Sequence, residues 1–195
     1  MKTDIILAGV GGQGILSIAT ILARAAMNED LYIKQAEVHG MSQRGGDVQS
    51  NLRISDRPIA SDLIPQGKAD LIISLEPMEA LRYVSYLAPE GWIVTNTVPF
   101  INVPNYPEQA VILSELDSYA RVVAFDVDSV AKSEASLRSS NMVLLGAAAP
   151  FIQIAHEKIE EAIRTVFGSK SQSIVDMNIK AFRAGFEQAN KRITQ

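Results

Sequence analysis

Glycines and one amide in the stretch Gly9–Gly14 could bind an anion. The sequence there reads G-V-G-G-Q-G, so Gly9, Gly11 and Gly14 fit the pattern G-x-G-x-x-G, with Gly12 and Gln13 between them. Glycine lets backbone N–H groups approach a phosphate closely, and a helix that follows presents its unpaired N–H groups to the same point. The spacing predicts a phosphate-binding turn. A tight turn that only packs a helix on a strand remains open.

A second cluster, between His39 and Asp47, gathers side chains of other kinds. His39 titrates near neutral pH, and Arg44 offers a planar fork suited to phosphate or carboxylate. The remaining donors and turn residues of this cluster are Ser42, Gln43, Gly45 and Gly46. Because sites concentrate on polar loops beside strand ends, His39 and Arg44 are candidate catalytic residues. The alternative is a plain β-hairpin connection in which Gly45-Gly46 makes the turn.

The elements around these clusters follow from hydrophobic periodicity. Residues 4–8 form a short apolar run, and the apolar residues of 15–25 recur at helical spacing. Residues 32–38 resemble a second strand. Glu37 near its end lies 23 positions after Gly14, where a dinucleotide-binding enzyme often places the acid that binds the ribose. Spacing alone therefore leaves NAD(P) binding open.

Further along the chain the patterns predict a sheet followed by helices. Residues 48–54 alternate as a half-buried strand does, 59–60 could return as a short strand, and 69–75 resemble a central parallel strand. A helix opening at Glu76-Pro77 should extend its buried face to Leu87, with a turn at 89–91 before a strand at 92–97. Residues 121–126 resemble the last strand.

The other segments are predicted as a surface excursion and helices. Residues 98–109 contain three prolines and suggest an ordered excursion that contacts a partner, whereas 111–113 are ambiguous. Asp128 or Ser129 should cap a helix to about 136. Ser139-Ser140-Asn141 should cap a buried helix that Pro150 ends, with Asn141 either a plain cap or a residue facing the site. Two amphipathic helices, 156–167 and 172–192, complete the chain, with His156 on the surface.

Composition narrows the class of protein. The 195 residues are 47% hydrophobic and 21% charged, with a net charge of −4, which fits one globular domain and argues against nucleic-acid binding. No apolar run is long enough for a membrane helix, and the start lacks the pattern of a signal peptide, so we expect a cytoplasmic protein. Cysteine is absent and histidine occurs twice, which excludes cysteine-held iron–sulfur clusters and disulfides in this sequence and gives no recognisable metal motif. We predict the α/β class: a single three-layer domain over residues 1–195, with a mostly parallel or mixed sheet, a Rossmann-like N-terminal βα unit and a helical C-terminus.

Two motifs together resemble a known family. Gly9–Ile15 (GVGGQGI) and Glu37–Gly46 (EVHGMSQRGG) are similar to the gamma-type domain of 2-oxoacid:ferredoxin oxidoreductases, and most fully to the small, beta subunit of the indolepyruvate type. The second motif is the more specific, and the resemblance extends over essentially the whole chain.

The resemblance implies a subunit of an enzyme that converts an aryl 2-oxoacid, coenzyme A and oxidised ferredoxin into an acyl-CoA, carbon dioxide and reduced ferredoxin. It places thiamine diphosphate and the iron–sulfur clusters on the large, alpha subunit, which agrees with the lack of cysteine here. Coenzyme A is then the expected co-substrate near this chain, and ferredoxin reaches it only through the holoenzyme. The residues expected to face coenzyme A or the partner are Gly9, Gly11, Gly12, Gln13, Gly14, Ser42, Gln43, Arg44, Gly45 and Gly46.

Two other functions remain open at this point. One is a free-standing NAD(P)- or nucleotide-binding protein that uses Glu37. The other is a regulatory or binding module without catalysis. The loop that carries Ser42, Gln43 and Arg44 could also insert into the partner and shape its substrate pocket instead of contacting coenzyme A.

Overall fold

The computed structural model describes residues 1–39 and 46–193, except for the side chain of His39. Its core is a six-stranded sheet with the order β2-β3-β1-β4-β5-β6. The strands are β1 Lys2–Val10, β2 Tyr32–His39, β3 Asp47–Ser55, β4 Ala69–Ser74, β5 Leu87–Asn96 and β6 Val122–Phe125. The strands β1, β4, β5 and β6 run parallel to one another, while β3 is antiparallel to both of its neighbours. The sheet is therefore mixed, as predicted.

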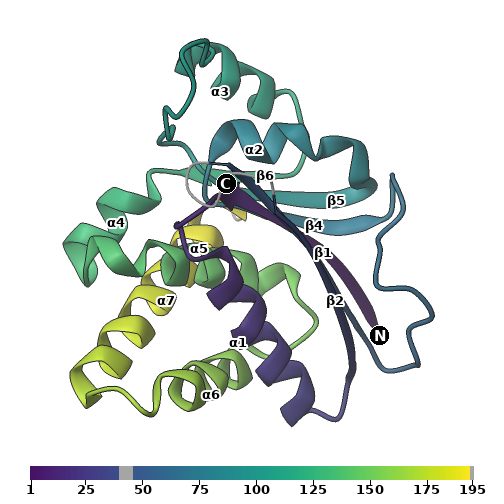
Figure 1. The fold of residues 1–195 in the computed structure, drawn as a ribbon. Coiled ribbons are helices and arrows are strands. Elements are labelled where there is room, and N and C mark those ends of the chain that lie inside the picture. The colour runs from purple at the N-terminus through teal and green to yellow at the C-terminus, as the bar shows by residue number, and fades with distance from the viewer. Residues whose placement is uncertain (40–45, 194–195) are drawn as a thin grey trace.

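Helices cover both faces of the sheet and make three layers (Figure 1). One face is covered by α2 and α3, and the other by α1, α4, α5, α6 and α7. The α-helices are α1 Ile15–Asn28, α2 Pro77–Arg82, α3 Gln109–Asp117, α4 Val127–Glu134, α5 Ser140–Ala148, α6 His156–Phe167 and α7 Gln172–Ile193. Single 3-10 turns occur at η1 Val84–Tyr86, η2 Leu137–Ser139 and η3 Ala149–Phe151. Within the described residues no helix is both long and apolar enough to span a bilayer.

The middle of the sheet is a topological switch point. After β1 the chain turns to α1 on one face, and after β4, which is the parallel neighbour of β1, it turns to α2 on the other. The two connections separate at the carboxyl ends of these strands and leave a crevice between them, where open α/β sheets bind their ligands. Gly9–Gly14 lies at this point, since it contains the last two residues of β1 and the turn, residues 11–14, that leads to α1.

Helix α5 is buried because it crosses α7 at a very short distance. A Cβ on Gly146 would lie 1.8 Å from the carbonyl oxygen of Phe182, and a Cβ on Gly185 would lie 1.8 Å from that of Val143. Glycines on both helices therefore let the two backbones touch. This packing explains why α5 is apolar on all sides, as the sequence predicted, and it fixes the start of α5 beside the crevice.

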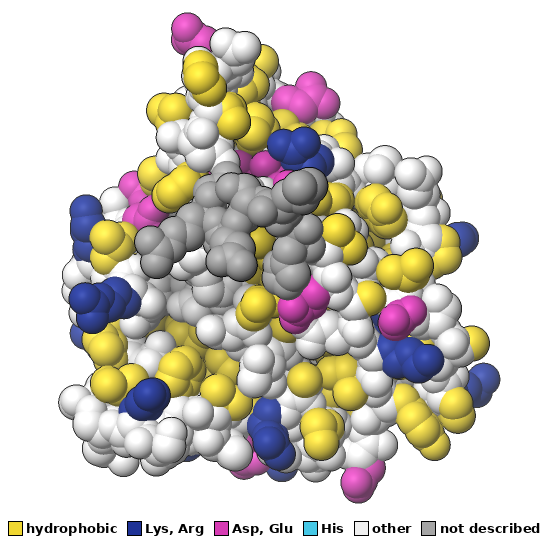
Figure 2. Space-filling view, in the orientation of Figure 1, with side chains coloured by type: hydrophobic (Ala, Val, Ile, Leu, Met, Phe, Trp, Pro, Cys, Tyr) yellow, Lys and Arg dark blue, Asp and Glu magenta, His cyan; other side chains and the backbone are white. Residues whose placement is uncertain are grey.

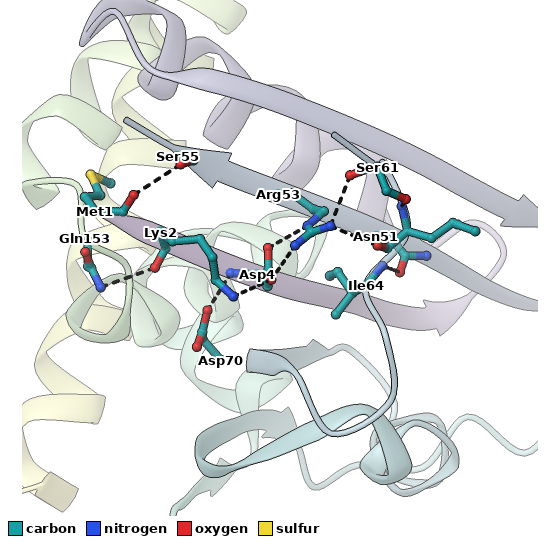
Figure 3. Close-up of polar contacts among 11 residues, drawn as sticks. Met1, Lys2, Asp4, Asn51, Arg53, Ser55, Ser61, Ile64, Asp70 and Gln153 are labelled. Carbon is teal, nitrogen blue, oxygen red and sulfur yellow. Dashed lines mark hydrogen bonds and ion pairs between the residues drawn. The ribbon is translucent and has the colours of Figure 1, made fainter. Parts of the chain in front are cut away.

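A buried ion pair joins the first part of β1 to the last part of β3 (Figure 3). Asp4 is fully buried and accepts hydrogen bonds from Arg53 Nε at 2.8 Å and Nη2 at 2.9 Å. Arg53 Nη1 also donates to the carbonyl oxygens of Ser61 and Leu63, at 3.1 and 3.0 Å. Asn51 Oδ1 accepts from the backbone N–H of Ile64 at 3.1 Å. Together these contacts fasten the segment between β3 and β4 over the sheet.

The structure corrects several local predictions. Residues 59–60 form no strand, because that segment is the covering loop just described. The strand β3 is buried on both faces over residues 49–52 instead of half-buried, because it lies inside the sheet between β1 and β2. The ambiguous residues 111–113 belong to α3.

Two boundaries also differ from the prediction. Residues 89–91 continue β5, which begins at Leu87, so the helix that starts at Pro77 ends at Arg82. The N-cap of α4 is Asp126, not Asp128 or Ser129, and its carboxylate accepts from the N–H of Ser129 at 2.8 Å. The hydrogen bonds from Ser129 lower the pKa of Asp126.

Candidate functional site

The turn after β1 has the backbone that an anion cradle requires. Gly12 and Gly14 have φ values of +101° and +85°, which L side chains rarely adopt, and Gly14 is the N-cap of α1. The first N–H groups of α1, from Ile15 and Leu16, have no partner one turn earlier in the helix. They lie at the positive end of the helix dipole. The sequence therefore folds here into a strand, turn and helix as predicted.

Gln13 braces this turn from inside. Its Oε1 accepts from the N–H of Val10 at 2.7 Å, and its Nε2 donates to the carbonyl oxygen of Leu75 at 3.3 Å. A Cβ on Gly9 would lie 2.9 Å from the same Oε1, so the glycine leaves room for this side chain. The Gln13 amide ties the ends of β1 and β4 together across the switch point. Its role in the turn is thus to hold the geometry.

Asn141 supports the turn from the other side. Its Nδ2 donates to the carbonyl oxygen of Gly14 at 3.2 Å and would lie 2.7 Å from a Cβ on that glycine. Asn141 is in the first turn of α5, and the α5–α7 crossing holds α5 in place. The side chain therefore faces the site, which was one of the two interpretations of this residue. A serine at the cap, Ser139, makes no side-chain cap bond.

We expect Gly14→Ala to destabilise the fold by about 1–2 kcal/mol, because alanine resists the left-handed conformation, and by more through overlap with Asn141. In the Gly14→Ala, Asn141→Ala double variant the overlap is gone. A double-mutant cycle measured by urea unfolding should therefore show the two losses to be less than additive. Additive losses would contradict the contact.

Two hollows flank the turn. The larger, of about 470 Å³, lies at the switch point, and the smaller, of about 310 Å³, lies between the turn, the start of α1 and Val48 of β3. The larger hollow is lined by Gly12, Gln13, Leu75, Asn96, Phe100, Asp128, Leu137, Arg138, Ser140 and Asn141. Gly12 lines both hollows, so a ligand in either one contacts the turn.

Polar contacts at the ends of β5 and α4 shape the larger hollow. Asn96 Oδ1 accepts from the N–H groups of Val98 and Val127, at 3.2 and 3.1 Å. Asp128 accepts from Asn96 Nδ2 at 3.3 Å and from Ser140 Oγ at 2.6 Å. The carboxylate of Asp128 is thus satisfied by neutral donors, while the exposed guanidinium of Arg138 makes no ion pair with any residue that the structure describes. One unpaired cation and the starts of α1 and α5 suit this hollow to an anion.

The second predicted cluster meets the turn at its end. The N–H of Gly11 donates to the carbonyl oxygen of Gly46 at 2.9 Å, which joins the two loops. The strands on either side, β2 and β3, pair antiparallel, with His39 opposite Val48, so the cluster connects a β-hairpin. Ser42, Gln43, Arg44 and Gly45 lie outside the described residues, as does the side chain of His39. Their predicted roles remain predictions.

Glu37 lies away from the turn. In β2 it pairs with Ser50 of β3, and β3 separates β2 from β1, whereas a dinucleotide site needs this acid on a strand beside the turn. Glu37 Oε1 accepts from Gln35 Nε2 at 2.6 Å. The inserted strand therefore argues against NAD(P) binding through Glu37.

His156, expected on the surface, has 39% of its side chain exposed and stacks on Phe186.

Sequence reasoning missed several residues of the larger hollow, among them Asn96, Arg138 and Phe100. Asn96 ends a parallel strand, and polar residues at that position are a usable signal for a site. Arg138 and Phe100 carry no local signal, because only the folded chain places them opposite the turn. Within the described residues no group of three or more His, Asp or Glu side chains could hold a metal ion.

These features define a class: an α/β domain with a braced glycine turn at the switch point of a mixed sheet, beside a hollow suited to an anion. Comparison with known proteins identifies the family of this chain. Residues 4–188 match the family described as pyruvate ferredoxin/flavodoxin oxidoreductase, and the chain belongs to that family.

Relatives of known name match this chain over nearly its whole length. The indolepyruvate oxidoreductase subunit IorB of Archaeoglobus fulgidus is 39% identical, over 97% of this chain and 96% of its own length. The gamma subunit of a keto/oxoacid ferredoxin oxidoreductase from Geobacter sulfurreducens is 26% identical, with a TM-score of 0.72 over 97% of this chain and 99% of that one. A 2-oxoglutarate:ferredoxin oxidoreductase from Magnetococcus marinus, solved with 2-oxoglutarate, coenzyme A and succinyl-CoA bound, has the same fold. It gives a TM-score of 0.76 at 22% identity, over 97% of this chain but 31% of that one.

Proposed function

We propose that this chain is the small, cofactor-free subunit of a 2-oxoacid:ferredoxin oxidoreductase that acts on indolepyruvate or a similar aryl 2-oxoacid. The identity to IorB over nearly the full length of both chains supports the substrate class. In this proposal thiamine diphosphate and the iron–sulfur clusters belong to the large subunit. The large subunit also passes electrons to ferredoxin. The complex works in the cytoplasm.

The contribution of this chain is to bind and orient coenzyme A. The observation that carries the proposal is the braced turn at the switch point, where Gly12 lines two hollows and the first N–H groups of α1 have no partner within the helix. The pyrophosphate or ribose phosphate of coenzyme A is the anion that such a cradle fits. The Magnetococcus protein of the same fold was solved with coenzyme A bound, which supports this ligand.

Two arginines, Arg44 and Arg138, are candidates to bind the phosphates of coenzyme A. Arg138 borders the larger hollow, and Arg44 belongs to the loop whose end, Gly46, is hydrogen-bonded to the turn. Each guanidinium can donate two hydrogen bonds to a phosphate, so each should contribute to the affinity for coenzyme A. His39 and Arg44 remain the candidates for a direct role in the reaction.

Reconstitution with the large subunit tests this function. We expect indolepyruvate- and coenzyme A-dependent reduction of ferredoxin only when both chains are present. Arg44→Ala and Arg138→Ala should each raise KM for coenzyme A by about tenfold, the loss of one charge-assisted hydrogen bond, with an unchanged melting temperature.

Arg57→Ala is the matched control, since Arg57 is exposed at the opposite end of β3 from the hollows. An unchanged KM in either site variant would remove that arginine from the coenzyme A site. Binding of NAD by the isolated chain, lost in Glu37→Ala, would contradict the subunit function altogether.

A further inference from the structure

The segment between β5 and α3, residues 97–108, exposes large apolar side chains beside the larger hollow. Phe100, Ile101 and Val103 are 45%, 72% and 42% exposed. Phe100 also lines the hollow, so the apolar segment continues into the site. Figure 2 shows hydrophobic side chains gathered over the upper part of the molecule, where Figure 1 places α3 and the segment leading to it.

This apolar segment is fastened to the sheet by a buried carboxylate. Glu76, the N-cap residue of α2, is 1% exposed and accepts from the Tyr106 hydroxyl and, at 3.3 Å, from the N–H of Phe100. Its other oxygen accepts from the N–H of Glu79 at 2.8 Å. Burial, followed by the Glu76 carboxylate, raises the pKa of Tyr106, so its hydroxyl stays protonated and continues to donate.

Hydrogen bonds hold this segment at several points, unlike a mobile lid. Gln109 Nε2 donates to the carbonyl oxygen of Thr97 at 2.9 Å, which closes the excursion at its base. With both ends and the middle held, Phe100, Ile101 and Val103 are presented at set positions. An ordered apolar surface that remains exposed is typical of a protein interface.

The charges around the segment select the kind of partner. Residues 97–120 contain three acidic residues, Glu108, Glu115 and Asp117, and no lysine or arginine. All three are exposed. An anionic membrane surface or a nucleic acid would be repelled, whereas a protein with an apolar patch inside a basic rim would be attracted.

We propose that residues 100–103 dock on the large subunit and that this contact closes the larger hollow over coenzyme A. The inference rests on the proposed function and names the surface through which it is carried out. Because Phe100 belongs to both the apolar segment and the hollow, a partner on the segment also covers the coenzyme A site. The Magnetococcus chain of the same fold is about three times as long as the part that this domain matches, so there the domain is continuous with other parts of its own chain.

The test uses the full chain and the purified large subunit in a binding titration. Ile101→Asp should weaken the complex at least tenfold, since a charge would be desolvated inside an apolar contact, while Ile101→Leu should bind as the parent does. Val111→Asp is the control, because Val111 is 63% exposed but lies on α3, outside the docking segment. KM for coenzyme A should rise with Ile101→Asp at limiting concentrations of the large subunit and recover at saturating ones.

Equal affinity of Ile101→Asp and the parent would overturn the docking surface and leave the proposed function intact. Equal weakening by Val111→Asp would also overturn it, because the effect would then be one of charge on any exposed site. Failure of the parent chain itself to bind the large subunit would instead contradict the proposed function.

Discussion

Replacing Gly146 by alanine is expected to destabilise the protein by at least about 3 kcal/mol, although alanine is the better helix former by about 1 kcal/mol. The reason is the contact with α7: a Cβ here would lie 1.8 Å from the carbonyl oxygen and 2.7 Å from the carbonyl carbon of Phe182. These are backbone atoms, which cannot rotate away as a side chain does. The two helices must separate, and the packing of α5 against the sheet is lost with them.

Urea unfolding of Gly146→Ala measures this loss, and Gly185→Ala should give a similar one, because its Cβ would meet the carbonyl of Val143. Glu187→Ala, on the exposed side of α7, is the control and should change stability by less than about 0.5 kcal/mol. A Gly146→Ala variant as stable as the parent would mean that the crossing can widen without cost.

Replacing Asp4 by alanine should cost about 3 kcal/mol, at the lower end of the range for breaking a buried ion pair. The change leaves Arg53, whose side chain is 17% exposed, without the carboxylate that two of its nitrogens contact. The lower end applies because Arg53 keeps its bonds to Ser61 and Leu63 and is not fully buried. Thermal or urea unfolding measures the effect.

Two further variants test why Asp4→Ala should lower the stability of the protein. Replacing the pair together, Asp4→Leu with Arg53→Met, should recover part of the stability, since no unpaired charge is then left inside, while the bonds of Arg53 to Ser61 and Leu63 are lost. Glu90→Ala breaks an exposed pair with Arg121 and should change stability by less than about 1 kcal/mol. If Asp4→Ala were as mild as Glu90→Ala, the ion pair between Asp4 and Arg53 would not contribute to the stability of the fold.

Local sequence patterns predicted most of the elements but not how distant ones meet. The strand, glycine turn and first helix follow from periodicity within residues 4–25, and the apolar run of α5 predicted its burial. The antiparallel insertion of β3 between β1 and β2 was not predictable, because alternation gives a strand but not its neighbours. Buried Glu76 was read only as a helix start, since its partner Tyr106 is 30 residues away.

The candidate site shows the same division. The glycines were singled out from spacing, and the positive φ values of Gly12 and Gly14 fit a tight turn, while phosphate binding at this turn stays a prediction. The hydrogen bonds by which Gln13 braces the turn were not predicted, because Leu75, to which its side chain donates, lies 62 residues further on. The cap of α4 was placed two or three residues late, since Asp126, Asp128 and Ser129 are all good capping residues and only the backbone decides among them.

The hydrogen bond between Asn141 and Gly14 joins residues 127 positions apart, and this separation bears on when the site forms. Asn141 lies in α5, which the crossing with α7 holds in place, so the contact depends on both helices being folded. During synthesis the glycine turn leaves the ribosome early, without this support. The candidate site is therefore completed only by the C-terminal third of the chain, and a chain shortened before α7 should lack the support that Asn141 gives to the turn.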